Sequence, residues 1–110
     1  KILINDVYVE TVTTLNYMRS KGVQNVVYQG YYHLKFGWIG TTKLNPAVDY
    51  GNLKLAQAVA NSTFPSANKV YIDPRGYITS SDIISDGVHP SKSGSQKLAN
   101  LLWPKLVPFL

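Results

Sequence analysis

The spacing of hydrophobic residues switches along the chain between the period of a helix and the period of a strand. Apolar positions three and four residues apart predict helices, and short runs rich in valine, isoleucine and tyrosine predict strands. We expect helices over residues 5–21, 45–61 and 91–103, and strands within residues 23–32 and 69–73.

Polar and special residues mark the ends of the first two helices. Asn5 or Asp6 is placed to cap the first helix, and Gly22 to end it in the left-handed conformation. Asn45 is placed to cap the second helix, with Pro46 at its first position. The second helix carries an apolar stripe of Val48, Leu55 and Val59, with Leu53, Ala56 and Ala60 beside it.

The third helix begins near Ser91 or Ser93, since Ser93 and Gln96 have the spacing of a capping box. We expect Pro104 to stop this helix, because a proline in a helix interior costs about 3 kcal/mol. Its expected buried face consists of Leu98, Leu101 and Leu102.

The order of these elements predicts an α/β fold. Helices that alternate with strands imply parallel strands joined by crossovers, and both strands are apolar enough to be buried on both faces. A parallel sheet normally needs three or more strands, and residues 1–4 are the candidate tail of a third. We therefore expect residues 1–110 to be a single unit. It forms the second half of a doubly wound domain, whose remaining strands pair with an edge exposed here.

The composition is that of a globular protein, with 45% hydrophobic and 15% charged residues. No apolar run approaches the roughly 20 residues that a membrane helix needs. Residues 1–4 run directly into polar positions, unlike a signal peptide. Cysteine is absent, which excludes disulfides, thiolate zinc sites and a cysteine nucleophile. Composition does not fix the compartment, and we favour a secreted or periplasmic one.

Asp86 and His89 carry the strongest chemical signal. They lie three residues apart in the turn Asp86–Pro90, immediately before the last helix. At this spacing the carboxylate can accept the Nδ1 proton of the imidazole, which leaves Nε2 free to act as a general base. Gly87 permits a tight turn, and Pro90 restricts His89 to an extended conformation. The alternative is a buried, hydrogen-bonded histidine beside a turn-forming aspartate.

The segment Asp86–Ser91, followed by Gly94 and an amphipathic helix, resembles the last conserved block of the SGNH (GDSL-like) hydrolase superfamily. Residues 22–28 resemble the helix-to-strand junction before the substrate loop of that family, and residues 69–75 resemble the strand before its acid–base block. Members of the family are esterases, lipases and carbohydrate deacetylases. The resemblance implies a flavodoxin-like three-layer α/β/α sandwich with a parallel sheet, and no cofactor.

The resemblance assigns the catalytic histidine to His89 and the catalytic aspartate to Asp86. The family's nucleophile lies in a Gly-Asp-Ser block, which this chain lacks. Its oxyanion asparagine lies in a Gly-x-Asn-Asp block. Asn5 and Asp6 match the end of that block, but Leu3 stands in place of the glycine. Asn5 is therefore a candidate oxyanion donor, with helix capping as the alternative.

We accordingly expect the chain to be the C-terminal part of a longer hydrolase. We expect it to be a cleaved product or a fragment, with a natural split protein as the less favoured case. The N-terminal portion would supply the serine nucleophile, and this chain alone would be inactive.

Tyr31, Tyr32, His33 and Trp38 lie in the loop after the first strand, where they are candidate walls of a substrate pocket or, alternatively, packing residues. No metal site is expected, because the two histidines are too far apart in sequence for a known metal motif. The remaining polar candidates are assigned structural roles: Asp49 and Asp82 as caps or solvent-facing residues, Asp73 as a turn residue before Pro74, and Ser91, Ser93 and Ser95 as caps.

The leading functional hypothesis is an ester hydrolase that uses a Ser-His-Asp mechanism. The alternative is a non-catalytic α/β domain that binds a carbohydrate or another ligand through the aromatic loop. A nucleic-acid-binding domain is suggested only by the net charge of +5. The eleven basic residues are scattered along the chain, which favours a solvated basic surface instead.

Overall fold

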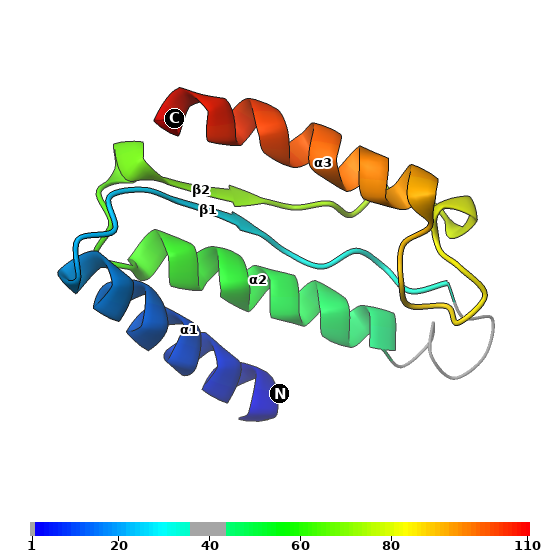
Figure 1. Cartoon of the computed structure of the whole chain (residues 1–110). Helices are drawn as coiled ribbons and strands as arrows, with labels where there is room; N and C mark the ends of the chain where they lie inside the picture. The colour runs from blue at the N-terminus through cyan, green and yellow to red at the C-terminus, as the bar shows by residue number, and fades with distance from the viewer. Residues whose placement is uncertain (1, 36–43) are drawn as a thin grey trace.

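The computed structural model describes residues 2–35 and 44–110. Figure 1 shows two central strands, with α3 on one side of them and α1 and α2 on the other. Short 3-10 turns η2, η3 and η4 span Ser66–Asn68, Ser80–Asp82 and Val107–Phe109. The main elements are, in chain order, α1 (Ile2–Ser20), β1 (Val26–Gln29), α2 (Asn45–Asn61), β2 (Lys69–Ile72) and α3 (Lys92–Leu106).

The two strands pair in parallel, which confirms the α/β class. The register places Val26 opposite Lys69 and Gln29 opposite Ile72, so both strands end level with each other. Within the described residues, each strand has a neighbour on one side only. All four residues of β1 are half-buried, and in β2 only Ile72 is buried. The strands are therefore less buried than the sequence predicts. A sheet of only two strands is too narrow for the helices to enclose it on both faces.

A small apolar core lies between the sheet and the helices on its α1–α2 side. Leu15, Val59 and Phe64 form its centre, and Tyr28 and Tyr71 pack against them from the two strands. The tyrosine rings stack with their centroids 6.3 Å apart. The radius of gyration is 15.0 Å, whereas a compact domain of this length would have about 13 Å. The chain is thus more extended than a compact domain of its length.

Helix α1 begins earlier than the sequence predicts. Residues 2–4 lie in the helix, so the prediction that residues 1–4 form the tail of a strand is wrong for the described residues 2–4. Asn5 consequently sits inside the helix rather than at its cap. The C-terminal end is as predicted: Gly22 has φ +100°, and the N–H of Val23 donates to the carbonyl of Met18 over 3.1 Å.

Asn45 and Asn52 of α2 bind the loop that follows β1. The side-chain amide of Asn52 accepts from the N–H of Tyr31 (2.8 Å) and donates to its carbonyl (2.7 Å). Asn45 makes the same pair of bonds to Leu34, over 2.7 and 3.2 Å. Asn45 is therefore not the N-cap that the sequence predicts, because both polar groups of its amide are engaged by the loop backbone. Each asparagine thus bonds both the N–H and the carbonyl of one loop residue, as the backbone of a neighbouring strand would.

The apolar faces of α2 and α3 also differ from prediction. Leu53 is 52% exposed, and the buried positions of α2 are Asn52, Leu55, Ala58 and Val59. Helix α3 continues to Leu106, so Pro104 does not stop it. A proline this close to the end removes a single backbone bond, which the last turn tolerates. The expected buried leucines of α3, Leu98, Leu101 and Leu102, are only half-buried.

Gly30 lies where the backbone leaves β1 and passes beneath two side chains. Its N–H donates to the carbonyl of Ile72 over 2.8 Å. A Cβ at this position would lie 2.0 Å from the hydroxyl of Tyr71 and 2.7 Å from Oδ1 of Asn52. Only glycine fits without displacing both groups, and both belong to the part of the core that positions the loop.

We expect Gly30→Ala to lower the free energy of unfolding by about 1–3 kcal/mol, because the added methyl overpacks this contact. Gly51→Ala in α2 is the matched control, since a Cβ there meets nothing within 4 Å. The control should gain about 0.5–1 kcal/mol from the better helix propensity of alanine. Urea denaturation of the two variants measures both values, and equal effects would contradict the close approach at Gly30.

Candidate active site

The turn that carries Asp86 and His89 is closed at its base by a short antiparallel bridge. Ile83 and Pro90 face each other across the bridge. The N–H of Ile84 donates to the carbonyl of His89 over 2.9 Å. Gly87, with φ +78°, allows the chain to reverse between them. The turn is therefore a closed loop that projects from η3 and the start of α3.

Within this turn, the carboxylate of Asp86 uses its two oxygens differently. Oδ1 accepts from the backbone N–H of Val88 (2.8 Å) and of His89 (2.9 Å). Oδ2 forms a short hydrogen bond with Nδ1 of His89. One carboxylate thus fixes both the backbone of the turn and the ring of the histidine.

These bonds lower the pKa of Asp86 to about 2, chiefly through the imidazole and then through the two backbone N–H groups. The carboxylate is therefore ionised at neutral pH. It favours the His89 tautomer with the proton on Nδ1 and the lone pair on Nε2. The His89 side chain is 73% exposed, and within the described residues its Nε2 has no hydrogen-bonding partner. Asp86 thus orients a ring that is largely open to solvent.

The loop after β1 is tied to the turn that holds the histidine. The hydroxyl of Tyr32 donates to the carbonyl of Val88 over 2.7 Å. The N–H of Lys35 donates to the carbonyl of Gly87 over 3.0 Å, and its ammonium donates to the carbonyl of Ile83 over 3.2 Å. Burial and the nearby charge of Asp86 raise the pKa of Tyr32, so its hydroxyl stays a donor. The loop after β1 and the turn Asp86–Pro90, which are far apart in sequence, are therefore held against each other.

A cavity of about 330 Å³ lies between these two loops, beyond the end of β1. Its lining includes His89 and Val88 on one side and Tyr31, Tyr32 and Leu34 on the other. Two of the predicted substrate-loop residues, Tyr31 and Tyr32, are thus brought together with His89. The volume is at the lower end of the range for small-molecule sites.

His33 does not line this cavity and belongs to a separate charge network. Its Nε2 lies 2.5 Å from Oδ1 of Asp49, and that oxygen also accepts from Arg75 over 2.7 Å. Arg75 donates in turn to Asp73 over 2.6 Å. The pKa of Asp49 is lowered by His33 and then by Arg75, and that of Asp73 by Arg75. The network joins α2 to the loops that follow β1 and β2.

The burial of Asp82 is the most consequential feature that the sequence does not show. The sequence predicts that Asp82 caps a helix or faces solvent, and the residue is 2% exposed. Its capping role in η3 is present, since its carboxylate accepts from the N–H of Thr79 over 2.9 Å. The same carboxylate accepts from Lys97 (2.7 Å) and Ser93 (2.8 Å) of α3. No local sequence pattern joins residues 82 and 97, so the burial was not visible in advance.

Two of the three serines after the histidine, Ser91 and Ser93, have structural partners, whereas Ser95 lies inside α3 and is not the cap that the sequence predicts. Ser91 is the N-cap of α3 and accepts from the N–H of Gly94 over 3.2 Å, as predicted. Ser93 binds Asp82 instead of forming the expected capping box. Neither is hydrogen-bonded to His89 in the part of the chain that the structure describes.

The other predicted site residues lie elsewhere. Asn5 lies on α1, where its side chain accepts from the hydroxyl of Tyr50 over 2.9 Å, and it does not line the His89 cavity. Trp38 falls outside the described residues. Over residues 2–35 and 44–110, no group of three or more histidine or carboxylate side chains is placed to hold a metal ion. No helix in the same ranges has the length and apolar character needed to cross a membrane.

Comparison of the chain with family models, with curated proteins and with solved structures finds no match.

We expect Asp82→Asn to destabilise the protein at pH 6, because Lys97 and Thr79 lose an ionised partner. Hydrogen bonds lower the pKa of Asp82, with that from Lys97 the largest contribution. A lowered pKa stabilises the fold above the ordinary aspartate value near 3.9, and this contribution is lost as pH falls through the lower folded-state value. The difference between wild type and variant should therefore shrink below about pH 4.

Urea denaturation at pH 6, 4 and 2.5 measures that difference. Asp6→Asn, at an exposed position of α1, is the matched control and should follow the wild type at each pH. Parallel pH profiles for wild type and Asp82→Asn would contradict the role given to this carboxylate.

Proposed function

We propose that the chain supplies the acid–base pair of a serine-dependent ester hydrolase of the SGNH type. One observation carries this proposal: Asp86 binds Nδ1 of His89, while Nε2 has no partner among the described residues and the largely exposed side chain lines a cavity. A histidine that served packing alone would be buried and bonded at both nitrogens. Esterase, lipase and carbohydrate-deacetylase activities all use this arrangement.

In the proposed reaction, Nε2 of His89 takes the proton of a serine hydroxyl as the serine oxygen attacks the ester carbonyl. Asp86 stabilises the resulting imidazolium. The imidazolium then gives its proton to the departing alcohol, and an acyl-serine remains. Water attacks the acyl-serine with His89 again as base, which releases the acid and returns the proton to serine. The net reaction converts ester and water to acid and alcohol.

The serine would come from a companion polypeptide, the N-terminal portion of the same hydrolase. The sequence has no Gly-Asp-Ser block, and Ser91 and Ser93, which follow the histidine, are engaged in capping α3 and binding Asp82. Oxyanion donors would be supplied with the serine.

The outer edge of β1 is where such a companion would dock. Its strand residues are half-buried and their outer backbone groups are unpaired within the described ranges. A depression of about 360 Å³ between α1 and β1 leaves Val26 and Tyr28 incompletely covered. Further parallel strands at this edge would extend the sheet and complete a flavodoxin-like three-layer sandwich. They would also protect an edge that otherwise invites aggregation.

We expect His89→Ala to lower kcat/KM for a chromogenic ester by at least about a thousandfold in the assembled hydrolase, because the serine loses its base. Asp86→Asn should cause a loss of similar size, since an amide favours the wrong imidazole tautomer. Asp6→Asn is the control for Asp86→Asn and should keep full activity. Circular dichroism confirms folding of each variant, and a folded His89→Ala protein with wild-type activity would refute the proposal.

We expect a fluorophosphonate probe, which labels activated serines, to modify the companion polypeptide and not this chain. Intact-mass spectrometry of the purified protein after labelling identifies the modified polypeptide. Labelling of a serine in residues 1–110 that depends on His89 would contradict the need for a companion. The same experiment on His89→Ala should show no label, because the serine is no longer activated.

A further inference from the structure

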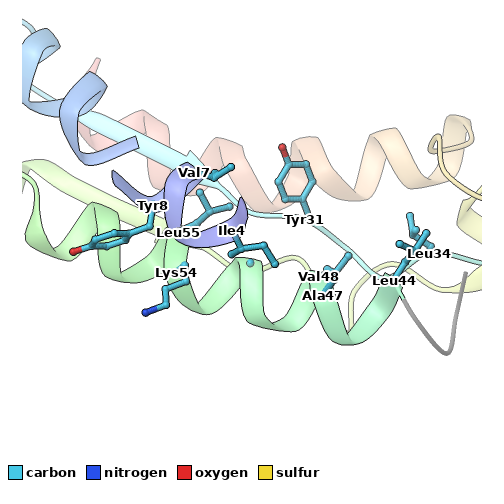
Figure 2. Close-up of a pocket in the computed structure, with 11 residues that line it drawn as sticks. Ile4, Val7, Tyr8, Tyr31, Leu34, Leu44, Ala47, Val48, Lys54 and Leu55 are labelled. Carbon is cyan, nitrogen blue, oxygen red and sulfur yellow. The ribbon is translucent and has the colours of Figure 1, made fainter. Parts of the chain in front are cut away.

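An apolar groove of about 400 Å³ runs between the first turns of α1 and the N-terminal half of α2 (Figure 2). Ile4 and Val7 line it from α1, and Ala47, Val48 and Leu55 line it from α2. Among the lining residues, only two tyrosines and Lys54 carry polar side-chain groups. In Figure 2 the ammonium of Lys54 points away from the end of the groove formed by Val48 and its neighbours.

This groove shares a wall with the cavity beside His89. Tyr31, Leu34 and Val48 line both spaces. The backbone of Tyr31 is held by Asn52 through two hydrogen bonds, while its side chain is 64% exposed. The ring therefore stands at the boundary between the two spaces on a fixed backbone. The groove and the cavity are therefore adjacent, with Tyr31, Leu34 and Val48 between them.

We propose that this groove holds the hydrocarbon chain of an ester whose carbonyl lies at His89, so that the enzyme prefers acyl chains longer than acetyl. The inference rests on the ester-hydrolase function proposed above and selects among its substrates. A sugar would need hydrogen-bonding groups along its length, and the groove lining offers only those of Tyr8, Tyr31 and Lys54. A hydrocarbon chain needs only apolar contact, and each methylene buried improves binding by about fourfold.

The test is a series of p-nitrophenyl esters from acetate to decanoate, assayed on the assembled hydrolase. We expect kcat/KM to rise by up to about fourfold per methylene until the groove is filled. Ala47→Trp places a large ring in the groove at a residue that does not line the His89 cavity. It should lower the ratio of octanoate to acetate activity at least tenfold. Ala60→Trp, at an exposed position near the other end of α2, should keep the ratio within twofold.

A second readout is independent of catalysis. Decanoate added to the assembled hydrolase should shift the methyl NMR signals of Val48 and Leu55, and Ala47→Trp should abolish the shifts. Acetate hydrolysis that depends on His89, without chain-length dependence or methyl shifts, would overturn the groove assignment and leave the hydrolase proposal standing. Methyl shifts without hydrolysis of any ester would overturn both, because the groove would then hold an apolar ligand that is no substrate.

Discussion

The position of the candidate site depends on one buried carboxylate. Removing Asp82 from water is costly unless its carboxylate is paired and hydrogen-bonded. Here it accepts from the ammonium of Lys97, the hydroxyls of Ser93 and Thr79, and the N–H of Thr79. Because Lys97 and Ser93 lie on α3 and Thr79 begins η3, the carboxylate locks the helix to the turn. The N–H of Ser91 adds a bond of 2.7 Å to the carbonyl of Asp82. The bridge that closes the His89 turn begins at Ile83, one residue after Asp82. The bonds of Asp82 therefore set the orientation of the turn.

The sequence predicts well those features whose causes are local. Asp86 and His89 are three residues apart, and their bond needs only the turn between them. The end of α1 follows from the freedom of Gly22 to adopt a positive φ. The main helices and strands follow from hydrophobic spacing. Where a local rule failed, a neighbouring preference outweighed it: residues 2–4 continue a helical pattern, and α3 extends past Pro104 at the cost of one backbone bond.

Features that depend on distant segments were not predictable in the same way. The charge network joins His33, Asp49 and Arg75 from three separate elements, and nothing in the sequence pairs them. The sequence predicts Asn45 as a cap and gives no role to Asn52, but the side-chain amides of both bind the backbone of the loop after β1. The half-buried leucines of α3 also depend on distant segments. An apolar helix face is predictable from the sequence, but its burial requires a second element that covers it.

The division of the Asp86 carboxylate between backbone and imidazole has a consequence for how an active site could be assembled. Both sets of bonds close within four consecutive residues. The imidazole is thus oriented by its own short peptide and requires no contact from any other polypeptide. Under the proposed function, a partner that docks on the sheet would meet an imidazole of His89 that is already oriented. The entropy of the imidazole is therefore lost when this chain folds and not when the partner associates.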